Sequence, residues 1–327
     1  MKKVLFFIAA AALLSGCKHT KALLPNVSGK AGEIIVVMEK SSWEGALGNG
    51  VRELLAKDCP FLVQQEPLYS LVNVIPSGFG DLFKVHRNIL IFNVNPQLDS
   101  AGVFFKHDAW AAPQCVIQVS ARDDAEAASL LENSGRNITN SFEQAERDRV
   151  IANSILYEER SITAKVAEVF GGSPRIPVGY KLKKLNLDFA WIADEKQYTM
   201  QGIFIYRYGA DEKEPFLLEN IIAHRNEFLK MNVPGMFDNT WMTTGSYFEP
   251  QLEYIKYRGR AIAQIHGYWE VENDYMGGPF VSHSFYSPDG RDIMVLEAFV
   301  YAPKYDKRQY LRQTESILYS WSWKDEK

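Results

Sequence analysis

Residues Asn137–Phe170, NITNSFEQAERDRVIANSILYEERSITAKVAEVF, predict one long helix that joins two different halves of the chain. The apolar side chains of this stretch recur at helical spacing on one face. They are Ile138, Phe142, Ala145, Ala152, Ile155, Ile162, Val166 and Val169. Gly135 is a candidate break just before the stretch, and Gly171 with Pro174 marks its end, because glycine readily adopts the left-handed conformation after a last helical turn. A continuous helix of this length is about 50 Å long at ~1.5 Å per residue.

Before this helix, short β-branched runs alternate with helical patterns, which is typical of an α/β arrangement. The runs that we predict as strands are Glu33–Met38, Leu68–Ile75, Asn88–Val94 and Cys115–Val119. Ser41 and Glu44 form a capping box for a helix that includes Leu47 and Val51, although three nearby glycines weaken this helix. Residues 33–175 are therefore predicted to form an N-terminal α/β half.

After the long helix, alternating strands and tight turns indicate a twisted antiparallel sheet that helices cover on one face. The predicted strands are Leu185–Trp191, Gly202–Tyr208, Gln251–Tyr257, Ala261–Val271, Phe280–Tyr286 and Asp292–Tyr301. Thirteen of the 16 tyrosines lie at or after Tyr198, so this half is rich in aromatic residues. We expect residues 176–327 to form a C-terminal antiparallel sheet plus helices. The whole chain is then an α+β protein with mixed and antiparallel sheets packed with helices.

The first 16 residues have the layout of a signal peptide, with Lys2 and Lys3 before the apolar run Val4–Leu14. This run is too short for a stable membrane span. Cys17 follows Leu-Ser-Gly, as in a bacterial lipobox, where the cysteine is acylated, for example with palmitate, and the chain is cut just before it. We therefore expect residues 17–32 to be a lipid anchor and a flexible tether, with membrane lipid as the partner of Cys17.

The composition is that of a folded protein, with 46% hydrophobic and 23% charged residues. Loss of residues 1–16 leaves 34 Lys and Arg against 40 Asp and Glu, a net charge of −6. This excess of negative charge argues against nucleic acid as a partner. No acidic run follows Cys17, of the kind that directs some lipoproteins to the cell surface. We therefore expect a location at the outer membrane, facing the periplasm.

Two further cysteines, Cys59 and Cys115, follow Cys17. In an oxidising compartment of the envelope they can form one disulfide. The alternative is two separate buried thiols, which behave as small apolar side chains. The spacing in the sequence does not show whether the two are close, so both alternatives stay open.

The sequence contains no local motif for nucleotide binding, serine hydrolysis or metal binding, and no cofactor is expected. The best local candidate is the strand Gln264–Glu272, in which His266 and Glu270 share one face, with His283 on a facing strand. A histidine beside a carboxylate serves as a general base, and two histidines with a glutamate hold zinc. The alternative is the polar face of a half-exposed strand, because alternation produces such rows in any surface sheet.

The tyrosines of the second half are the other candidate site. Tyr254, Tyr268, Tyr275 and Tyr286 are candidates for lining a groove that takes a glycan or a peptide. Aromatic rings stack on sugars and pack against peptides, and the hydroxyls form hydrogen bonds. The alternative is that tyrosine simply suits strands with one wet face.

Several segments together resemble a known family. They are the lipobox at Cys17, SGKAGEIIVVME at Ser28–Glu39, Trp43-Glu-Gly45, His86-Arg-Asn-Ile-Leu90 and Asn232-Val-Pro-Gly235. Over nearly its whole length the chain resembles a group of bacteroidete lipoproteins of unknown function, domain of unknown function 4837. The resemblance implies a lipid anchor and an envelope location, and it brings no assigned activity and no catalytic residue.

The anchor, the tether and the aromatic sheet favour a lipid-anchored envelope protein that binds or assembles with a partner and is not an enzyme. The partner is then another envelope protein, a glycan or a peptide. Two alternatives stay open. One is a periplasmic hydrolase or metal-dependent enzyme that uses His266, Glu270 and His283. The other is a structural scaffold of the envelope.

Overall fold

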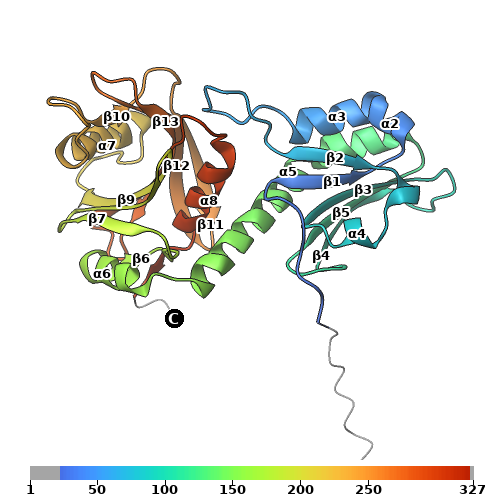
Figure 1. Cartoon of the computed structure of the whole chain (residues 1–327), viewed down its shortest axis with the longest axis horizontal. Coiled ribbons are helices and arrows are strands. Elements are labelled where there is room, and N and C mark those ends of the chain that lie inside the picture. The colour runs from blue at the N-terminus through green and yellow to red at the C-terminus, as the bar shows by residue number, and fades with distance from the viewer. Residues whose placement is uncertain (1–22, 325–327) are drawn as a thin grey trace, which may run out of the picture.

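The computed structural model describes residues 23–324 and shows two halves, each with its own sheet, joined by a long helix (Figure 1). The predicted α+β class is confirmed. The predicted signal peptide, residues 1–16, and the predicted lipidation site Cys17 lie outside the described residues. Within the described part of the chain, no helix combines the length and the apolar character that a membrane span requires.

A five-stranded sheet forms the first half, in the order β2-β1-β3-β5-β4. Its strands are β1 (Glu33–Val37), β2 (Ser70–Val74), β3 (Asn88–Val94), β4 (Gly102–His107) and β5 (Cys115–Ala121). β1, β2, β3 and β5 run parallel, and β4 pairs antiparallel with β5 at the edge. The sequence analysis predicted the four parallel strands and missed β4. The side chains of β4 are exposed or half-buried, so its sequence lacks the alternation that marks a strand.

Helices α3 (Ala46–Leu55) and α5 (Asp124–Leu156) cover one face of this sheet. Short elements complete the half: α2 (Lys40–Glu44), the 3-10 turn Pro76–Gly78 and α4 (Asp81–Lys84). The single helix predicted from Ser41 is instead two, because Gly45 adopts an extended conformation between α2 and α3.

The long helix begins at Asp124, before the stretch Asn137–Phe170. The carboxylate of Asp123 accepts a hydrogen bond from the backbone N–H of Glu126 at 2.8 Å and so caps the first turn. Gly135 does not break the helix. Its missing side chain lets α3 approach closely, since a Cβ at this position would lie 3.0 Å from the side chain of Leu54.

The same helix ends earlier than predicted, so one continuous helix over residues 137–170 is wrong. After Leu156 the chain leaves the helix, and α6 (Arg160–Phe170) follows as a separate helix. Between the two, the N–H of Glu159 donates to the carbonyl of Ile176, and the N–H of Val178 donates to the carbonyl of Tyr157. Pairing with this distant extended segment interrupts the helix where the sequence has neither glycine nor proline.

An antiparallel eight-stranded sheet forms the second half, in the order β10-β12-β13-β14-β9-β8-β7, with β11 paired to β12. Its strands are β7 (Lys181–Leu185), β8 (Phe189–Lys196), β9 (Thr199–Gly209), β10 (Met242–Thr244), β11 (Gln251–Tyr257), β12 (Arg260–Val271), β13 (Gly277–Tyr286) and β14 (Asp292–Tyr301). A small sheet pairs β6 (Gly172–Ser173) with β15 (Ser322–Trp323). The predicted strand Leu185–Trp191 is wrong, because a turn closed by the N–H of Asn186 and the carbonyl of Phe189 separates β7 from β8.

Helices cover both faces of this second sheet, whereas the sequence analysis predicted helices on one face only. α7 (Leu218–Asn232) packs on one face through Ile221 and Leu229. On the other face, α6 and α8 (Arg308–Leu318) pack against apolar strand residues through Val166 and Ile317. α6 therefore contributes to the core of the second half.

The predicted flexible tether, residues 17–32, is packed onto the first half from Pro25 onward. The N–H of Ala112 donates to the carbonyl of Pro25 at 2.9 Å, and the N–H of Ser28 donates to the carbonyl of Val85 at 2.8 Å. The tether prediction is therefore wrong for this segment, since its backbone groups are paired with the body.

Candidate functional site in the cleft between the two halves

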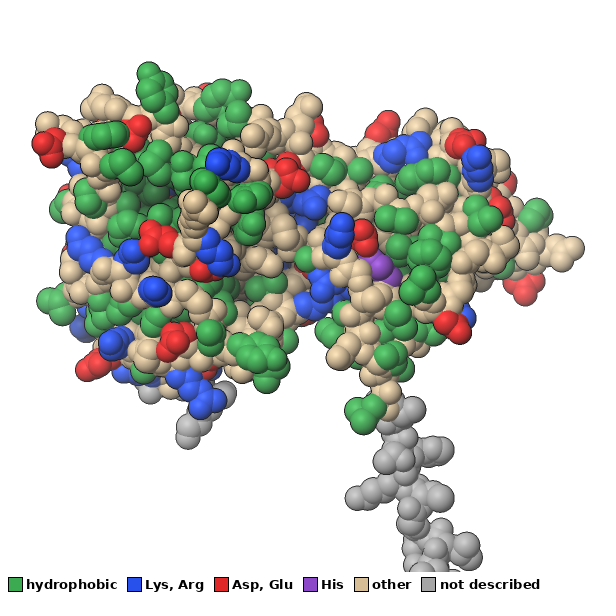
Figure 2. All heavy atoms as spheres, in the orientation of Figure 1, with side chains coloured by type: hydrophobic (Ala, Val, Ile, Leu, Met, Phe, Trp, Pro, Cys, Tyr) green, Lys and Arg blue, Asp and Glu red, His purple; other side chains and the backbone are tan. Residues whose placement is uncertain are grey.

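A cleft of about 720 Å³ separates the two halves, and we call it the inter-half cleft. The middle of α5 forms its floor. The loop at residues 57–61 forms one wall, and β11, β12 and α8 form the other. Lys and Arg side chains gather where the two halves meet (Figure 2). A second hollow of about 720 Å³ lies within the first half, between β4, the loop that follows it and α5.

Positive charge is in excess in the inter-half cleft. Its charged lining consists of Lys57, Arg136, Glu143, Arg147, Glu253, Lys256, Arg308, Arg312 and Glu315, which is six cations against three anions. Arg312 pairs with Glu143 at 2.8 Å, and Arg136 pairs with Glu253 at 3.6 Å on the exposed rim. The remaining groups attract an anion to the cleft.

Arg147 is the cation at the centre of this arrangement. Its guanidinium carbon lies 3.8 Å from the ring centroid of Tyr319, and Nη1 donates to Oε1 of Gln144 at 2.9 Å. Among residues 23–324, no carboxylate lies within ion-pair distance of Arg147. A guanidinium over an aromatic ring can still donate hydrogen bonds from its remaining N–H groups to a carboxylate or phosphate.

Phe61 brings the first half into contact with the second. It has a left-handed backbone (φ 62°) and is almost fully buried, although it belongs to a connecting loop. Its ring stacks on His266 with centroids 6.1 Å apart and meets Phe248 edge-on at 5.9 Å. The loop thereby forms an aromatic wall that also covers one face of His266.

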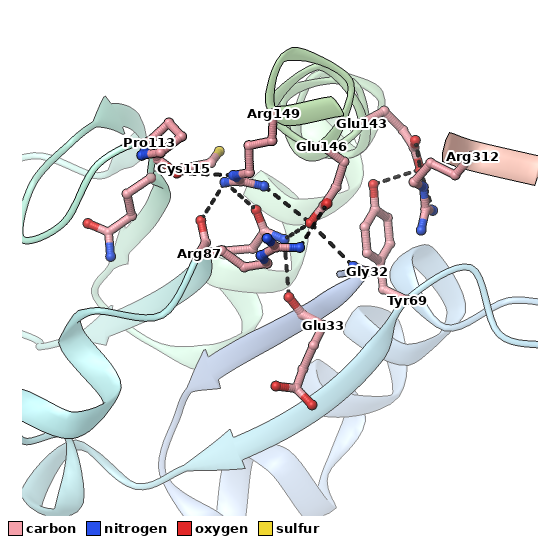
Figure 3. A network of polar contacts seen from close by, with 12 residues as sticks. Gly32, Glu33, Tyr69, Arg87, Pro113, Cys115, Glu143, Glu146, Arg149 and Arg312 are labelled. Carbon is pink, nitrogen blue, oxygen red and sulfur yellow. Dashed lines mark hydrogen bonds and ion pairs between the residues drawn. The ribbon is translucent and has the colours of Figure 1, made fainter. Parts of the chain in front are cut away.

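Glu143, Arg312 and Tyr69 join the halves beside the cleft floor (Figure 3). Arg312 donates to both carboxylate oxygens of Glu143, and the Tyr69 hydroxyl donates to the same group at 2.6 Å. Burial by itself would raise the pKa of Glu143, but the charge and hydrogen bonds of Arg312 and the hydroxyl of Tyr69 hold that pKa below its usual value. Glu143 is therefore ionised at neutral pH.

A further contact between the halves lies at the start of α8. The buried carboxylate of Glu66 accepts the backbone N–H groups of Lys307 and Arg308 at 2.7 and 2.8 Å. A carboxylate at this position satisfies unpaired N–H groups and complements the helix dipole. The first half therefore caps a helix of the second.

Glu146 organises a buried network on the side of α5 that faces the first sheet (Figure 3). Its carboxylate accepts the side-chain amide of Asn88 at 2.7 Å and the backbone N–H of Gly32 at 3.3 Å. Arg87 and Arg149 lie 3.4 and 3.2 Å from it. Two cations and two neutral donors surround the buried carboxylate, so the network fixes α5 to the sheet.

The structure separates the three predicted catalytic or zinc-binding residues. His266 lines the inter-half cleft, and His283 is fully buried beside Gln264. Glu270 lies four residues from His266 along β12, which places it about 13 Å away at ~3.3 Å per residue. Within the part of the chain that the structure describes, no three His, Cys, Asp or Glu side chains are grouped closely enough to hold a metal ion.

His283 is a neutral core histidine. The amide nitrogen of Gln264 lies 2.9 Å from Nε2 of His283 and 2.7 Å from the hydroxyl of Tyr319. Burial, and then the positive charge of Arg147, lower the pKa of His283 well below its usual value. The polar row predicted on β12 is therefore partly a buried network under α8.

The four predicted groove tyrosines do not converge. Tyr254 and Tyr286 both contact Phe216, the first through a hydrogen bond of 3.1 Å and the second edge-on. Tyr254 is paired with Ala263, so these two side chains lie on the same face of the sheet. Tyr268 follows Ala263 by five residues along β12, and side chains alternate along a strand, so Tyr268 lies on the opposite face. Tyr275 is fully exposed in the β12–β13 loop. The four tyrosines therefore do not line one common groove, and ligand binding by any of them stays a prediction.

Cys59 and Cys115 are both free thiols, so the disulfide alternative is wrong and the alternative of two separate thiols holds. Cys115 is buried against α5, and its sulfur lies 3.9 Å from the carbonyl of Ser141. Burial raises the pKa of Cys59 to about 11 and that of Cys115 to about 12. Both side chains are therefore in the thiol form at neutral pH.

The sequence analysis missed the main residues of the cleft, namely Glu143, Arg147, Arg312 and Phe61. One signal was available for two of them, since Glu143 and Arg147 are four residues apart and share a helical face with Arg136. Arg312 and Phe61 carry no local signal, because their roles depend on contacts with residues far away in the chain.

Two family models match the chain. Residues 159–320 match Domain of unknown function (DUF4837), and residues 27–154 match Domain of unknown function (DUF8532). No curated protein matches. The predicted resemblance to family 4837 is therefore supported for the second half, while the segments quoted from Ser28, Trp43 and His86 fall in the other match. The chain thus combines a segment similar to one family of unknown function with a segment similar to another, and the two meet where α5 ends.

Proposed function

We propose that this chain is a lipid-anchored protein of the cell envelope whose body is a binding module, and that the inter-half cleft takes an anionic segment of a peptide or glycan. Cys17 after Leu-Ser-Gly, at the end of a signal-peptide pattern, supports the anchor and a location at the outer membrane facing the periplasm. The cleft supports binding, because both halves contribute to its lining.

The environment of Arg147 is the reason why we propose an anionic ligand. Its guanidinium stacks on Tyr319 and has no carboxylate partner among the described residues, in a cleft with three more cations than anions. A ligand carboxylate or phosphate at this position gains charge-assisted hydrogen bonds without displacing a protein carboxylate from Arg147. The aromatic side chain of Tyr257, which is half-buried in the lining, offers a flat surface to the rest of the ligand.

The histidines favour binding over hydrolysis. His283 is neutral, buried and bonded to Gln264, so it has no access to a substrate in the cleft. His266 is half-buried beneath Phe61, and Glu270 lies too far along the strand to orient it. The side chains of the cleft are therefore arranged to bind a ligand, and its histidines are not arranged for hydrolysis.

The test is calorimetric titration of the purified protein with matched probes. Oligoglutamate and oligogalacturonate are the anionic probes, and oligoglutamine and a neutral oligosaccharide of equal length are the controls. We expect one anionic probe to bind and its neutral counterpart not to bind. Arg147→Gln is expected to weaken that binding by about tenfold or more, the worth of one charge-assisted pair. Arg136→Gln is the control variant, because its side chain is 86% exposed at the rim.

Equal binding of anionic and neutral probes, or unchanged affinity in Arg147→Gln, would contradict the assignment of the cleft. No binding of any probe would favour the scaffold alternative. The anchor is tested separately, by metabolic labelling with palmitate in the wild type and in Cys17→Ala. Label in the wild type and none in the variant is the expected result, and an unlabelled wild type would overturn the lipid-anchored location.

A further inference from the structure

The outer face of the first-half sheet is covered only by a one-turn helix and loops, although its strand side chains Ile35, Ile89 and Val116 are buried beneath them. β1, β2, β3 and β5 are parallel, and sheets of parallel strands are normally packed on both faces. Here α3 and α5 cover the inner face, while the one-turn helix α4 and neighbouring loops lie over the outer face (Figure 1). We call the outer surface the open face, and its apolar side chains are Val72, Ile75, Phe79, Leu82, Phe104 and Trp110.

The open face exposes large apolar side chains that nothing in the described chain covers. Leu82 on α4 is 79% exposed, and Phe104 on the edge strand β4 is 46% exposed. Val72 and Ile75 are also exposed, and Trp110 meets Phe79 edge-on at 5.8 Å. In Figure 2, hydrophobic side chains continue over this face toward the start of the described chain. Several large exposed apolar side chains on one face of a domain favour a contact surface there.

The described chain begins beside this same face. Pro25 pairs with Ala112, which follows Trp110 by two residues, and Ser28 pairs with Val85, which follows α4 directly. Leu23, the first described residue, is fully exposed. The proposed anchor at Cys17 is six residues upstream, so a fully extended chain keeps Leu23 within about 20 Å of the lipid.

We propose that the open face is a membrane-contact surface that rests on the lipid headgroups and acyl boundary, with Leu82 and Phe104 as its leading contacts. This inference rests on the lipid anchor proposed above. A short anchor holds this face near the bilayer at a high effective concentration. Weak apolar contacts are then enough to keep the face on the membrane surface. The charges on the face do not oppose this, because Asp81 and Lys84 neutralise each other at 3.0 Å and Lys106 suits an anionic lipid surface.

The test places a polarity-sensitive fluorophore on the full-length, lipidated protein in vesicles of phosphatidylethanolamine and phosphatidylglycerol. One variant carries it at Leu82→Cys and the matched control at Leu187→Cys, which is equally exposed (80%) but lies in the second half. Cys59 and Cys115 have strongly raised pKa values, so the added cysteine is labelled selectively. Quenching by lipids brominated on their acyl chains then reports contact with the membrane.

We expect several-fold stronger quenching at position 82 than at position 187. Equal quenching at the two positions in vesicles that do carry the protein would overturn the inference while leaving the anchor intact. Failure of the protein to float with the vesicles would instead remove the anchor and the inference with it. Dimer-dependent shielding at position 82 without lipid quenching would show that a second copy of the chain covers this face, which also overturns the proposal.

Discussion

Arg312 and Glu143 form a two-point ion pair that joins the two halves of the molecule. Nη2 of Arg312 lies 2.8 Å from Oε1 of Glu143, and Nε lies 3.2 Å from Oε2. The two residues are 169 positions apart in the chain, and the guanidinium also lies over the ring of Tyr69 at 4.7 Å. This pair helps to set the spacing of the inter-half cleft, because a bidentate pair fixes direction as well as distance.

A double-mutant cycle on this pair measures how strongly it couples the halves. We expect Glu143→Gln and Arg312→Gln to show a coupling free energy of about 2 kcal/mol in urea unfolding, since the pair is largely withdrawn from water. Arg136 and Glu253 provide the control pair, also between the halves but on the exposed rim, where coupling below about 0.5 kcal/mol is expected. Equal coupling in the two cycles would show that Arg312 and Glu143 have no special role.

Glu146 is expected to be the most sensitive charged position on α5. Glu146→Gln keeps the shape of the side chain but leaves the charges of Arg87 and Arg149 uncompensated. We expect it to lower the free energy of unfolding by about 3 kcal/mol. Glu132→Gln is the control, because Glu132 is exposed on the same helix and its loss should change stability by less than about 0.5 kcal/mol. Similar values for the two variants would contradict the network.

His283 predicts a loss of stability in mild acid. Its pKa is lowered well below the usual value in the folded protein, so below about pH 6.5 the unfolded chain binds a proton that the folded one does not. The free energy of unfolding should therefore fall as the pH drops from about 7 to 5, by at most about 1.4 kcal/mol per pH unit for this group.

His283→Asn is expected to flatten this pH dependence, and His107→Asn, an exposed control, to leave it unchanged. The measurement is urea unfolding at a series of pH values, followed by tryptophan fluorescence. An identical slope in the wild type and His283→Asn would place His283 in a solvated or charged state and contradict its burial.

The two free thiols predict slow alkylation. Cys59, with a pKa of about 11, is only about one part in a thousand thiolate at pH 8, and Cys115 less. We expect both to react with iodoacetamide within minutes after denaturation without reductant, but slowly in the folded protein. An exposed cysteine at Leu187→Cys gives the reference rate. Two thiols that react only after reduction would show a disulfide.

Gly29 is expected to be needed for docking of the first described segment. It has φ +88°, and a Cβ there would lie 2.0 Å from the ring of His86. Gly29→Ala should therefore release residues 25–32 and increase their cleavage by protease. Gly179→Ala is the matched control, since Gly179 also has a positive φ (+105°) but open space around it. Equal protease sensitivity in the two variants would show that backbone strain alone explains the effect of Gly29→Ala, and that the contact with His86 is not needed for docking.

Local patterns in the sequence predicted most of the fold. The β-branched runs correspond to β1, β3 and β5, and the four strands predicted after Gln251 correspond to β11, β12, β13 and β14. Alternation and helical spacing arise from which side of an element is buried, so they are readable wherever one side meets the core. The sequence did not predict β4, because this edge strand has no buried side. It did not predict the break after α5 either, because the break depends on pairing with residues 176–178.

The cleft depends on contacts that no local pattern records. Gln264 and His283 were visible as polar residues on neighbouring strands, but whether they face water or a helix was settled by α8 packing over them. Among residues 23–324 no carboxylate lies within ion-pair distance of Arg147, while Arg312 on another helix pairs with Glu143. Pairing of charges that lie far apart in the sequence depends on how the two halves dock. Docking in turn depends on many contacts between residues that are distant in the chain. The chain's periodicities therefore specify its elements, and the packing of those elements specifies which charges remain available to a ligand.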